Sequence, residues 1–233
     1  IRKLYALQKY SVMRGFKPKH FSFNVDGGRC EKCKGEGQVI IEMQFMADVY
    51  IKCDACNGKR FIKDVLEVTF KQKNIDDILN LTVDEAIDFF DLNGEVKIKN
   101  KLQTLKDVGL GYVKLGQSSS TLSGGEAQRI KLASFLGLKN NKKNGLFIFD
   151  EPTTGLHYHD INKLLRSINS LIEKGNTVII VEHNIELIKC ADHLIDLGPK
   201  GGNKGGEIVA MGKPEEIILK KKSITAKYLR KVL

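Results

Sequence analysis

The sequence predicts an α/β fold, a parallel sheet with flanking helices, joined to a zinc-binding β-ribbon module. Two observations lead to this prediction. Four of the five cysteines form two C-x-x-C pairs in the first quarter of the chain, and two apolar runs of strand length, separated by a helical pattern, follow after residue 120. Paired cysteines at this spacing are typical of zinc sites, and strand–helix–strand is the repeating unit of parallel sheets.

Composition limits the class of protein. With 42% hydrophobic and 28% charged residues, the chain of 233 residues can build a core, which excludes wholesale disorder. The net charge is 38 − 28 = +10, and residues 1–63 carry 13 basic against 6 acidic side chains, so we expect a polyanionic partner. No apolar run of membrane-spanning length occurs, and the five cysteines are too few for a disulfide scaffold. We therefore expect a cytoplasmic protein without a membrane partner.

The chain divides into three predicted segments: a basic zinc-binding insertion module over 1–65, a helical segment over 66–116, and an α/β segment over 117–233. The first residues, 1–5, include neither an initiator Met nor an apolar signal core, so we interpret the chain as beginning inside a longer protein. In the helical segment, alternation over 66–70 predicts a strand. A capping box then opens a helix at Thr82, and a further helical pattern ends at Gly109.

The α/β segment contains the predicted strands 146–149 and 177–181, both apolar throughout as buried parallel strands are, with a helix over 161–172 between them. A third strand is expected over 193–197, and Pro214 should begin a terminal helix. Cys190 falls in a short amphipathic helix, where we expect a buried thiol. The lysine-rich 139–143 and the glycine-rich 198–206 are interpreted as loops.

The paired cysteines follow the pattern Cys30-x2-Cys33-x19-Cys53-x2-Cys56. Each C-x-x-C turn presents two thiolates from one bend, and two bends complete a tetrahedral shell, so the pattern predicts a structural zinc ion. Segments 38–45 and 48–52 between the pairs predict the two strands of a ribbon. A redox pair and four buried thiols are the alternatives.

Basic residues surround this module and could contact the phosphates of a nucleic acid. A solvated basic face is an equally good interpretation of their composition. The residues are Arg29, Lys32, Lys34, Lys52, Lys59, Arg60 and Lys63.

Two glycines follow Ser123 at the start of a predicted helix. Ser123 and Glu126 fit a capping box, which any protein can use. Gly124 and Gly125 do not suit that interpretation, because each costs up to about 1 kcal/mol relative to alanine in a helix. They expose backbone N–H groups at the positive end of the helix dipole, which suits a phosphate.

Acidic residues follow the first apolar strand. Asp150 and Glu151 lie at its carboxyl end, where α/β proteins bind ligands, and could hold Mg²⁺ and activate water. His183 follows the next strand at the same edge. A single histidine there is more often structural than catalytic, but its position favours a role in the site.

These elements, in this order, resemble the signature motif, the Walker B strand with its glutamate, and the switch histidine of the ATP-binding cassette family. The resemblance narrows to the C-terminal half of the UvrA family of excinuclease proteins, which has such a zinc insertion. It rests on the first cysteine knuckle with its glycines, residues 28–37. Four further stretches support it: 48–50, 122–129, 150–157 and 195–199. It implies a partial ATP-binding cassette domain, with 66–116 as part of the helical signature domain.

The resemblance also implies a function: damage recognition in bacterial nucleotide excision repair. Members of the family bind damaged double-stranded DNA as homodimers and load the helicase-like excinuclease component UvrB. By the family pattern Asp150 is the magnesium-associated aspartate, Glu151 the hydrolytic base and His183 the γ-phosphate contact. Ser123, Gly124, Gly125 and Glu126 would form the signature motif facing a partner cassette's ATP. Cys30, Cys33, Cys53 and Cys56 match the zinc ligands. The implied cofactors are zinc, ATP and Mg²⁺.

One departure concerns activity. The phosphate-binding motif G-x-x-x-x-G-K-[ST] occurs nowhere in the 233 residues, so we expect the chain alone to be inactive as an ATPase. A zinc-dependent nucleic-acid-binding module without ATPase function is the alternative from another class. A cassette ATPase for transport or chromosome architecture is a third, which leaves the zinc pattern unexplained.

Overall fold

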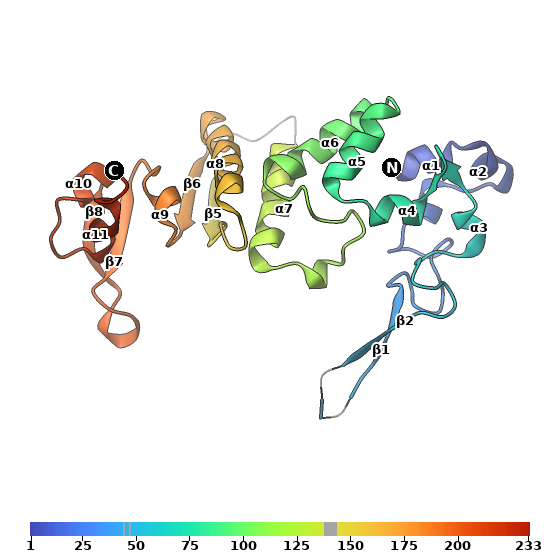
Figure 1. The fold of residues 1–233 in the computed structure, drawn as a ribbon, viewed down its shortest axis with the longest axis horizontal. Coiled ribbons are helices and arrows are strands. Elements are labelled where there is room, and N and C mark those ends of the chain that lie inside the picture. The colour runs from blue at the N-terminus through green and yellow to red at the C-terminus, as the bar shows by residue number, and fades with distance from the viewer. Residues whose placement is uncertain (44, 47, 138–143) are drawn as a thin grey trace. The chain divides into compact units, whose positions relative to one another are not determined.

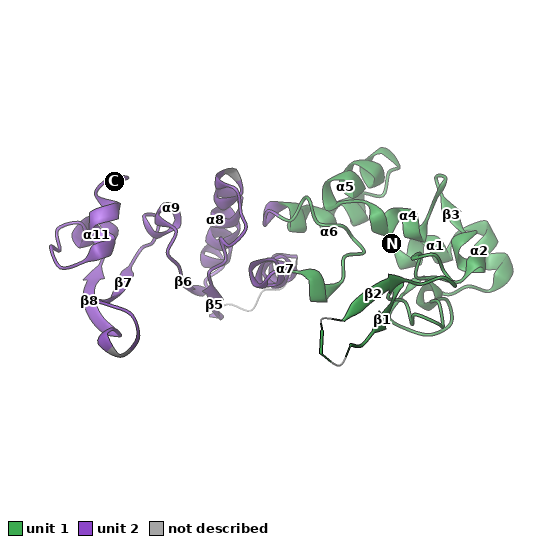
Figure 2. Ribbon diagram, turned by 60° about the horizontal axis from the view of Figure 1, so that its bottom comes forward, with its two compact units in different colours: residues 1–106, 110–122 green, residues 107–109, 123–233 purple. Residues whose placement is uncertain are grey.

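The computed structural model describes residues 1–233 except 44, 47 and 138–143 (Figure 1). It divides into two compact units, residues 1–106 with 110–122 and residues 107–109 with 123–233 (Figure 2). Among the described residues, no helix combines the length and the apolar character needed to cross a bilayer.

Unit 1 is mainly helical. Its elements are α1 (Arg2–Ala6), α2 (Lys9–Arg14), η1 (Pro18–Phe21), β1 (Gln38–Ile41), β2 (Val49–Lys52), α3 (Lys63–Leu66), β3 (Thr69–Phe70), β4 (Lys73–Asn74), α4 (Ile75–Asn80), α5 (Val83–Leu92), α6 (Val96–Asp107) and η2 (Ser119–Thr121). Its core joins residues far apart in sequence, including Tyr5, Phe61, Ile78 and Phe90. The hydroxyl of Tyr5 donates a hydrogen bond to the carbonyl of Lys73 over 2.7 Å, so the buried ring keeps its polar end paired.

The predicted signals for the start of α5 and the end of α6 are present in the structure. Thr82 and Glu85 form the predicted box at the start of α5, and Gly109 adopts φ +79° just after α6. The predicted strand over 66–70 is wrong in its first part. Leu66 ends α3, and only Thr69–Phe70 pair, with Lys73–Asn74. Val65 and Val68 are both fully buried, and their spacing of three residues is that of a helical turn, which places both side chains in the core.

The predicted ribbon is confirmed. β1 and β2 pair antiparallel, with Gln38 opposite Lys52 and Ile41 opposite Val49, and they extend away from the helices of unit 1 (Figure 1). Both strands are shorter than the predicted 38–45 and 48–52, and residue 44 lies outside the described residues. The side chains of β2 are exposed along its whole length.

Unit 2 has the predicted strand–helix–strand order. α7 (Gly124–Leu136) precedes β5 (Leu146–Asp150), α8 (Tyr158–Glu173), β6 (Thr177–Val181) and α9 (Ile185–Ile188). β5 and β6 pair parallel, from Leu146 opposite Thr177 to Asp150 opposite Val181. The expectation that both strands are buried throughout is wrong. The face with Phe147 is covered, its ring lying 5.1 Å from that of Phe135 on α7, but Leu146 and Ile148 are 59% and 65% exposed. The reason is that successive side chains point to opposite faces, and the described residues cover only one.

The rest of unit 2 differs partly from expectation. β7 (Leu194–Gly198) confirms the third predicted strand, but it pairs antiparallel with β8 (Glu207–Gly212), which the sequence analysis missed. The intervening loop contains the 3-10 turn η3 (Gly202–Lys204). Pro214 begins α10 (Pro214–Ile217), which is followed by α11 (Ile224–Leu229), so the predicted terminal helix is two short helices.

Cys190 is exposed, which corrects the expectation of a buried thiol. It lies just beyond α9, which ends at Ile188, and its Sγ lies 3.3 Å from the carbonyl of Glu186. The helix predicted to bury it ends two residues before it. The predicted loop 139–143 lies outside the described residues.

Candidate functional site

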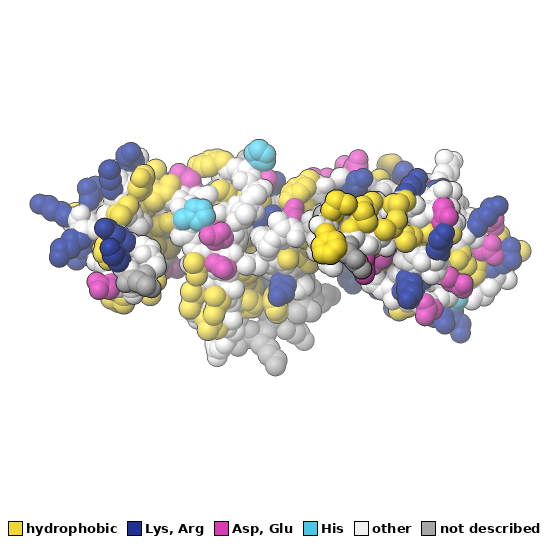
Figure 3. Space-filling model, turned by 90° about the horizontal axis from the view of Figure 1, so that it is seen from below, with side chains coloured by type: hydrophobic (Ala, Val, Ile, Leu, Met, Phe, Trp, Pro, Cys, Tyr) yellow, Lys and Arg dark blue, Asp and Glu magenta, His cyan; other side chains and the backbone are white. Residues whose placement is uncertain are grey.

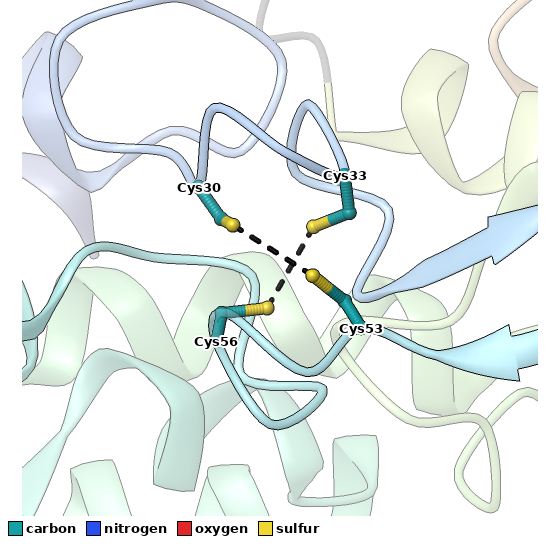
Figure 4. A group of neighbouring side chains, drawn as sticks. All are labelled: Cys30, Cys33, Cys53 and Cys56. Carbon is teal, nitrogen blue, oxygen red and sulfur yellow. Dashed lines mark hydrogen bonds between the residues drawn. The ribbon is translucent and has the colours of Figure 1, made fainter.

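The four paired cysteines converge at the base of the ribbon (Figure 4). Their Sγ atoms all lie within 4.8 Å of one another, with 3.9 Å between Cys30 and Cys53 and 3.6 Å between Cys33 and Cys56. All four are buried. A tetrahedral zinc ion with Zn–S bonds of about 2.3 Å holds its sulfurs about 3.8 Å apart. The spacing and chemistry of this donor set therefore fit zinc, and the set can hold one ion.

Backbone geometry accounts for the glycines of the knuckles. Gly35 has φ +90°, and a Cβ atom there would lie 2.0 Å from the carbonyl oxygen of Phe23, so only glycine fits. The N–H of Gly37 donates to Cys33 Sγ over 3.2 Å, and its carbonyl accepts from the N–H of Cys53 over 3.0 Å. The two knuckles are thus tied to each other by backbone as well as by their sulfurs.

The same backbone acts on the thiols. The N–H of Cys56 points at Cys53 Sγ and lowers the pKa of Cys53 to about 7. Burial has the opposite effect on Cys56 and raises its pKa to about 12. Because zinc binds thiolates, the donated N–H groups stabilise the form of Cys53 that a zinc ligand needs.

The basic residues of the module fall into two groups, and the first is engaged within the protein. Arg29 pairs with Asp26 over 2.8 Å, Lys32 pairs with Asp54 over 2.6 Å, and Arg60 donates to the carbonyl of Gly116. The guanidinium of Arg60 also lies 5.3 Å from the centre of the Phe23 ring. These three cations are therefore already paired within the protein.

The second group is exposed and forms no ion pair with the described residues. It consists of Lys34, Lys52, Lys59 and Lys63. Hydrophobic side chains cluster over the ribbon, and Lys and Arg side chains elsewhere on this view of unit 1 are interleaved with acidic ones (Figure 3). Phe45, in the segment between β1 and β2, is 96% exposed. The free basic surface is therefore smaller than the sequence suggested.

In unit 2, the carboxyl ends of β5 and β6 bring three predicted site residues to one edge. Asp150 ends β5 opposite Val181, which ends β6, and His183 follows two residues later. The Nδ1 atom of His183 lies 3.5 Å from Oε1 of Glu151, and both side chains are more than half exposed. Glu151 has φ +45°, which is uncommon for a residue with a side chain. Its N–H donates to the carbonyl of Val181 over 2.9 Å, which fixes the strained residue to β6.

The start of α7 has both features expected from the sequence. The N–H of Ser123 donates to the Glu126 carboxylate over 2.7 Å, and the N–H of Glu126 donates to Ser123 Oγ over 3.3 Å, which completes the capping box. The N–H groups of Gly124 and Gly125 donate no hydrogen bond to the described residues. A Cβ atom on Gly125 would lie 3.1 Å from the carbonyl of Thr154, so glycine also allows close packing there.

Sequence reasoning missed two residues that join α7 to the end of β5. Gln128 and Asp150 form two hydrogen bonds, and Arg129, only 1% exposed, donates to the carbonyls of Pro152 and Thr154 over 3.0 and 3.1 Å. A signal for Arg129 existed. It lies three residues before the buried Leu132, and this spacing places it on the buried face of the helix.

A third residue was missed at the end of β6. The carboxylate of Glu182 accepts hydrogen bonds from Thr153, His183 and Asn184. Burial, the largest effect on its pKa, would raise it, but these donors outweigh burial and lower the pKa. An acidic residue between an apolar strand and a histidine was the available signal.

Comparison with known proteins identifies the family of the chain. The sequence profile of the ABC transporter family matches residues 31–154, just over half of the chain. Together with the parallel β5–β6 pair and the acidic residues and histidine at its edge, this match shows that the chain belongs to the ABC (ATP-binding cassette) family.

Within that family, the chain is a homologue of part of UvrABC system protein A, or UvrA. It is 57% identical to the protein of that name from Clostridium perfringens and 55% identical to that from Aquifex aeolicus, in each case over all 233 residues. It covers 24% and 25% of those two proteins, about a quarter of their length. The crystal structure of UvrA2 from Deinococcus radiodurans matches the whole chain with a TM-score of 0.88 and 48% identity, and the chain covers 28% of it.

Proposed function

We propose that this chain supplies half of an ATP-hydrolysing site and a zinc-stabilised DNA-binding module to a UvrA-type damage-recognition protein of nucleotide excision repair. The observation that carries the ATPase part is the 3.5 Å approach of Glu151 and His183 at the carboxyl ends of adjacent parallel strands. This edge is where α/β proteins bind their ligands. A carboxylate beside an imidazole there suits the activation of a water molecule next to a phosphate.

Each residue at this edge has a proposed task. Asp150 binds the Mg²⁺ that accompanies ATP, which would supply charge neutralisation at the phosphates. Glu151 accepts a proton from the attacking water, and His183 donates a hydrogen bond to the γ-phosphate. Ser123, Gly124 and Gly125 face the nucleotide of a partner cassette, and the free N–H groups of the two glycines support this task. Glu126 holds that turn in shape through the capping box.

The zinc module has the proposed task of contacting DNA. Zinc bound by Cys30, Cys33, Cys53 and Cys56 fixes the base of the ribbon, so that its orientation is set before DNA arrives. The four exposed lysines around it are the phosphate contacts that we propose. The proposed partners are damaged double-stranded DNA, the helicase-like excinuclease component UvrB and a second copy of the full-length protein. The proposed location is the cytoplasm. The similarity to UvrA supports all three partners.

A zinc-dependent nucleic-acid-binding module without ATPase function explains less. It accounts for the cysteines and the basic charge, but it gives no reason for the strained Glu151 beside His183. Strain of this kind persists where function requires it.

The test is ATP hydrolysis by a full-length protein that carries this sequence and whose other cassette has been inactivated. Glu151→Gln should lower kcat by about 100-fold or more, as the loss of a general base does. The 233-residue chain alone should show no turnover above that of its own Glu151→Gln variant, because it has no phosphate-binding loop. Full activity in the full-length Glu151→Gln variant would refute the proposed role of this edge.

A further inference from the structure

The carboxylate of Glu182 is fully occupied by hydrogen bonds within the protein. Its Oε1 accepts from the N–H of Thr153 over 3.0 Å and from the Thr153 hydroxyl. Its Oε2 accepts from the N–H groups of His183 and Asn184 over 2.7 and 2.9 Å. A carboxylate offers about four lone-pair sites, and all four are taken here. Glu182 therefore has no capacity left for a metal ion or a water molecule, although it lies next to the proposed catalytic edge.

The donors come from two loops that carry the proposed catalytic groups. Thr153 lies two residues after Glu151, in the loop that follows β5. His183 and Asn184 lie in the loop that follows β6. The parallel ladder ends at Asp150 and Val181, and the N–H of Glu151 adds one bond to the carbonyl of Val181. Beyond that point, within the part of the chain that the structure describes, no backbone hydrogen bond joins residues 152–154 to residues 182–184.

The side chain of Glu182 thus replaces the missing rungs of the ladder. Thr153 is 8% exposed, so the bonds to it lie away from competing water. Because the side chains of Glu151 and His183 are 54% and 78% exposed, neither is held by packing alone. The 3.5 Å between them depends on the relative position of their two loops.

We propose that Glu182 is a positioning residue, which clamps the loop after β5 to the loop after β6 and so sets His183 against Glu151. The inference rests on the ATPase function proposed above. Glu182 itself takes no part in the chemistry. Its effect on hydrolysis passes through the two residues whose loops it joins.

The deciding variant is Glu182→Gln in the full-length protein with its other cassette inactivated. Glutamine keeps the size of the side chain, but in either orientation its NH2 group would face a backbone N–H donor, so at least one of the hydrogen bonds is lost. We expect kcat to fall by about 10-fold or more, as it does when an outer partner of a site residue is removed, with KM for ATP nearly unchanged. Glu186→Gln, a change four residues later on α9, is the matched control and should leave kcat unchanged.

Two further measurements separate positioning from a general loss of structure. In a His183→Ala background, Glu182→Gln should lower kcat by a smaller factor than in the unchanged protein, whereas a purely structural defect would lower it by the same factor again. Hydrogen exchange should become faster at the amides of Thr153, His183 and Asn184, and stay unchanged in α8. Thr153→Val removes only the hydroxyl donor and should show the same pattern more weakly. It replaces Glu182→Gln if that variant does not fold.

The outcomes are distinguishable. If Glu151→Gln and His183→Ala leave hydrolysis intact, the proposed function fails. If both lower kcat but Glu182→Gln hydrolyses ATP like the unchanged protein, or adds its full effect to that of His183→Ala, the function stands and the positioning role is overturned.

Discussion

Gln128 pairs with the backbone of Asp150 through both ends of its carboxamide. Its Nε2 donates to the carbonyl of Asp150 over 2.8 Å, and its Oε1 accepts from the N–H of Asp150 over 3.2 Å. A side chain on α7 thus binds the end of β5 as a neighbouring strand would. The turn that we propose to face a partner's ATP and the strand end that we propose to bind Mg²⁺ are therefore coupled, and movement of one should displace the other.

One zinc ion per chain is expected after extensive desalting. Cys53→Ser should lower the metal content to well below one and make residues 38–52 sensitive to protease, because a structural site contributes folding energy directly. Cys190→Ser, which changes an exposed thiol that is not part of the cluster, should keep one zinc. Metal analysis by mass spectrometry gives the stoichiometry. A metal-free protein with an intact, protease-resistant ribbon would contradict the zinc assignment.

Binding to a lesion-containing duplex should weaken with salt, and the exposed lysines should set the slope. Each phosphate-contacting lysine contributes about one unit to the slope of log K against log salt. We expect the triple change Lys34→Ala, Lys52→Ala and Lys59→Ala to reduce the slope by up to about 3. Lys32→Ala should leave it nearly unchanged, since that lysine already pairs with Asp54 over 2.6 Å. A larger effect from Lys32 than from the triple change would show that the ion pairs of the module open on DNA.

Arg129→Met tests how α7 is attached to the loop after β5. The guanidinium donates two hydrogen bonds to carbonyls, but its Nε and Nη2 are buried without a hydrogen-bond partner. Because each bond from a charged donor contributes about 1.5–3 kcal/mol, we expect the two bonds to outweigh that cost, and the variant to lose about 2 kcal/mol in free energy of unfolding. The exposed Arg166→Met should change it by less than about 0.5 kcal/mol. Denaturant titration measures both, and a gain in stability for Arg129→Met would mean that the buried charge costs more than its bonds contribute.

The pH dependence of stability should include a contribution from Glu182. Its pKa is lowered in the folded protein from the ordinary value of 4.5, so the folded state binds its proton less readily than the unfolded state. Its stabilising contribution is therefore complete above pH 4.5 and is lost as the pH falls through the folded pKa. The difference in Tm between the unchanged protein and Glu182→Gln should be constant near neutral pH and shrink under acid. A difference that grows on acidification would show the opposite sign of shift.

Features set within a few residues could be predicted well from the sequence. The C-x-x-C knuckles, the capping box at Thr82, the N1 proline of α10 and the left-handed Gly109 each depend on neighbours within about four positions. The strand–helix–strand order of β5, α8 and β6 was equally clear, because apolar periodicity reports which face of an element is buried.

Features that depend on distant partners could not be predicted. The alternation over 66–70 is typical of a strand. The structure instead ends α3 at Leu66, because Val65 and Val68 both pack into the core of unit 1. β7 was predicted without β8, because the pairing of the two strands forms across a loop and leaves no local pattern in the sequence.

The candidate site shows the same division. The sequence by itself determined the chemical groups: four thiols for zinc, Asp150 and Glu151 after a strand, His183 after the next, and a glycine-rich helix start. Only the tertiary structure decided which of these groups lie together, and which charged groups are already paired within the protein. Lys32 and Arg29 form ion pairs with Asp54 and Asp26. Glu182, to which the sequence assigned no role, joins the loops after β5 and β6 by hydrogen bonds. The physical reason is that residue type fixes charge and hydrogen-bonding capacity, but whether that capacity is free depends on which groups the fold brings together, some of them more than 20 positions apart, such as Lys32 with Asp54 and Thr153 with Glu182.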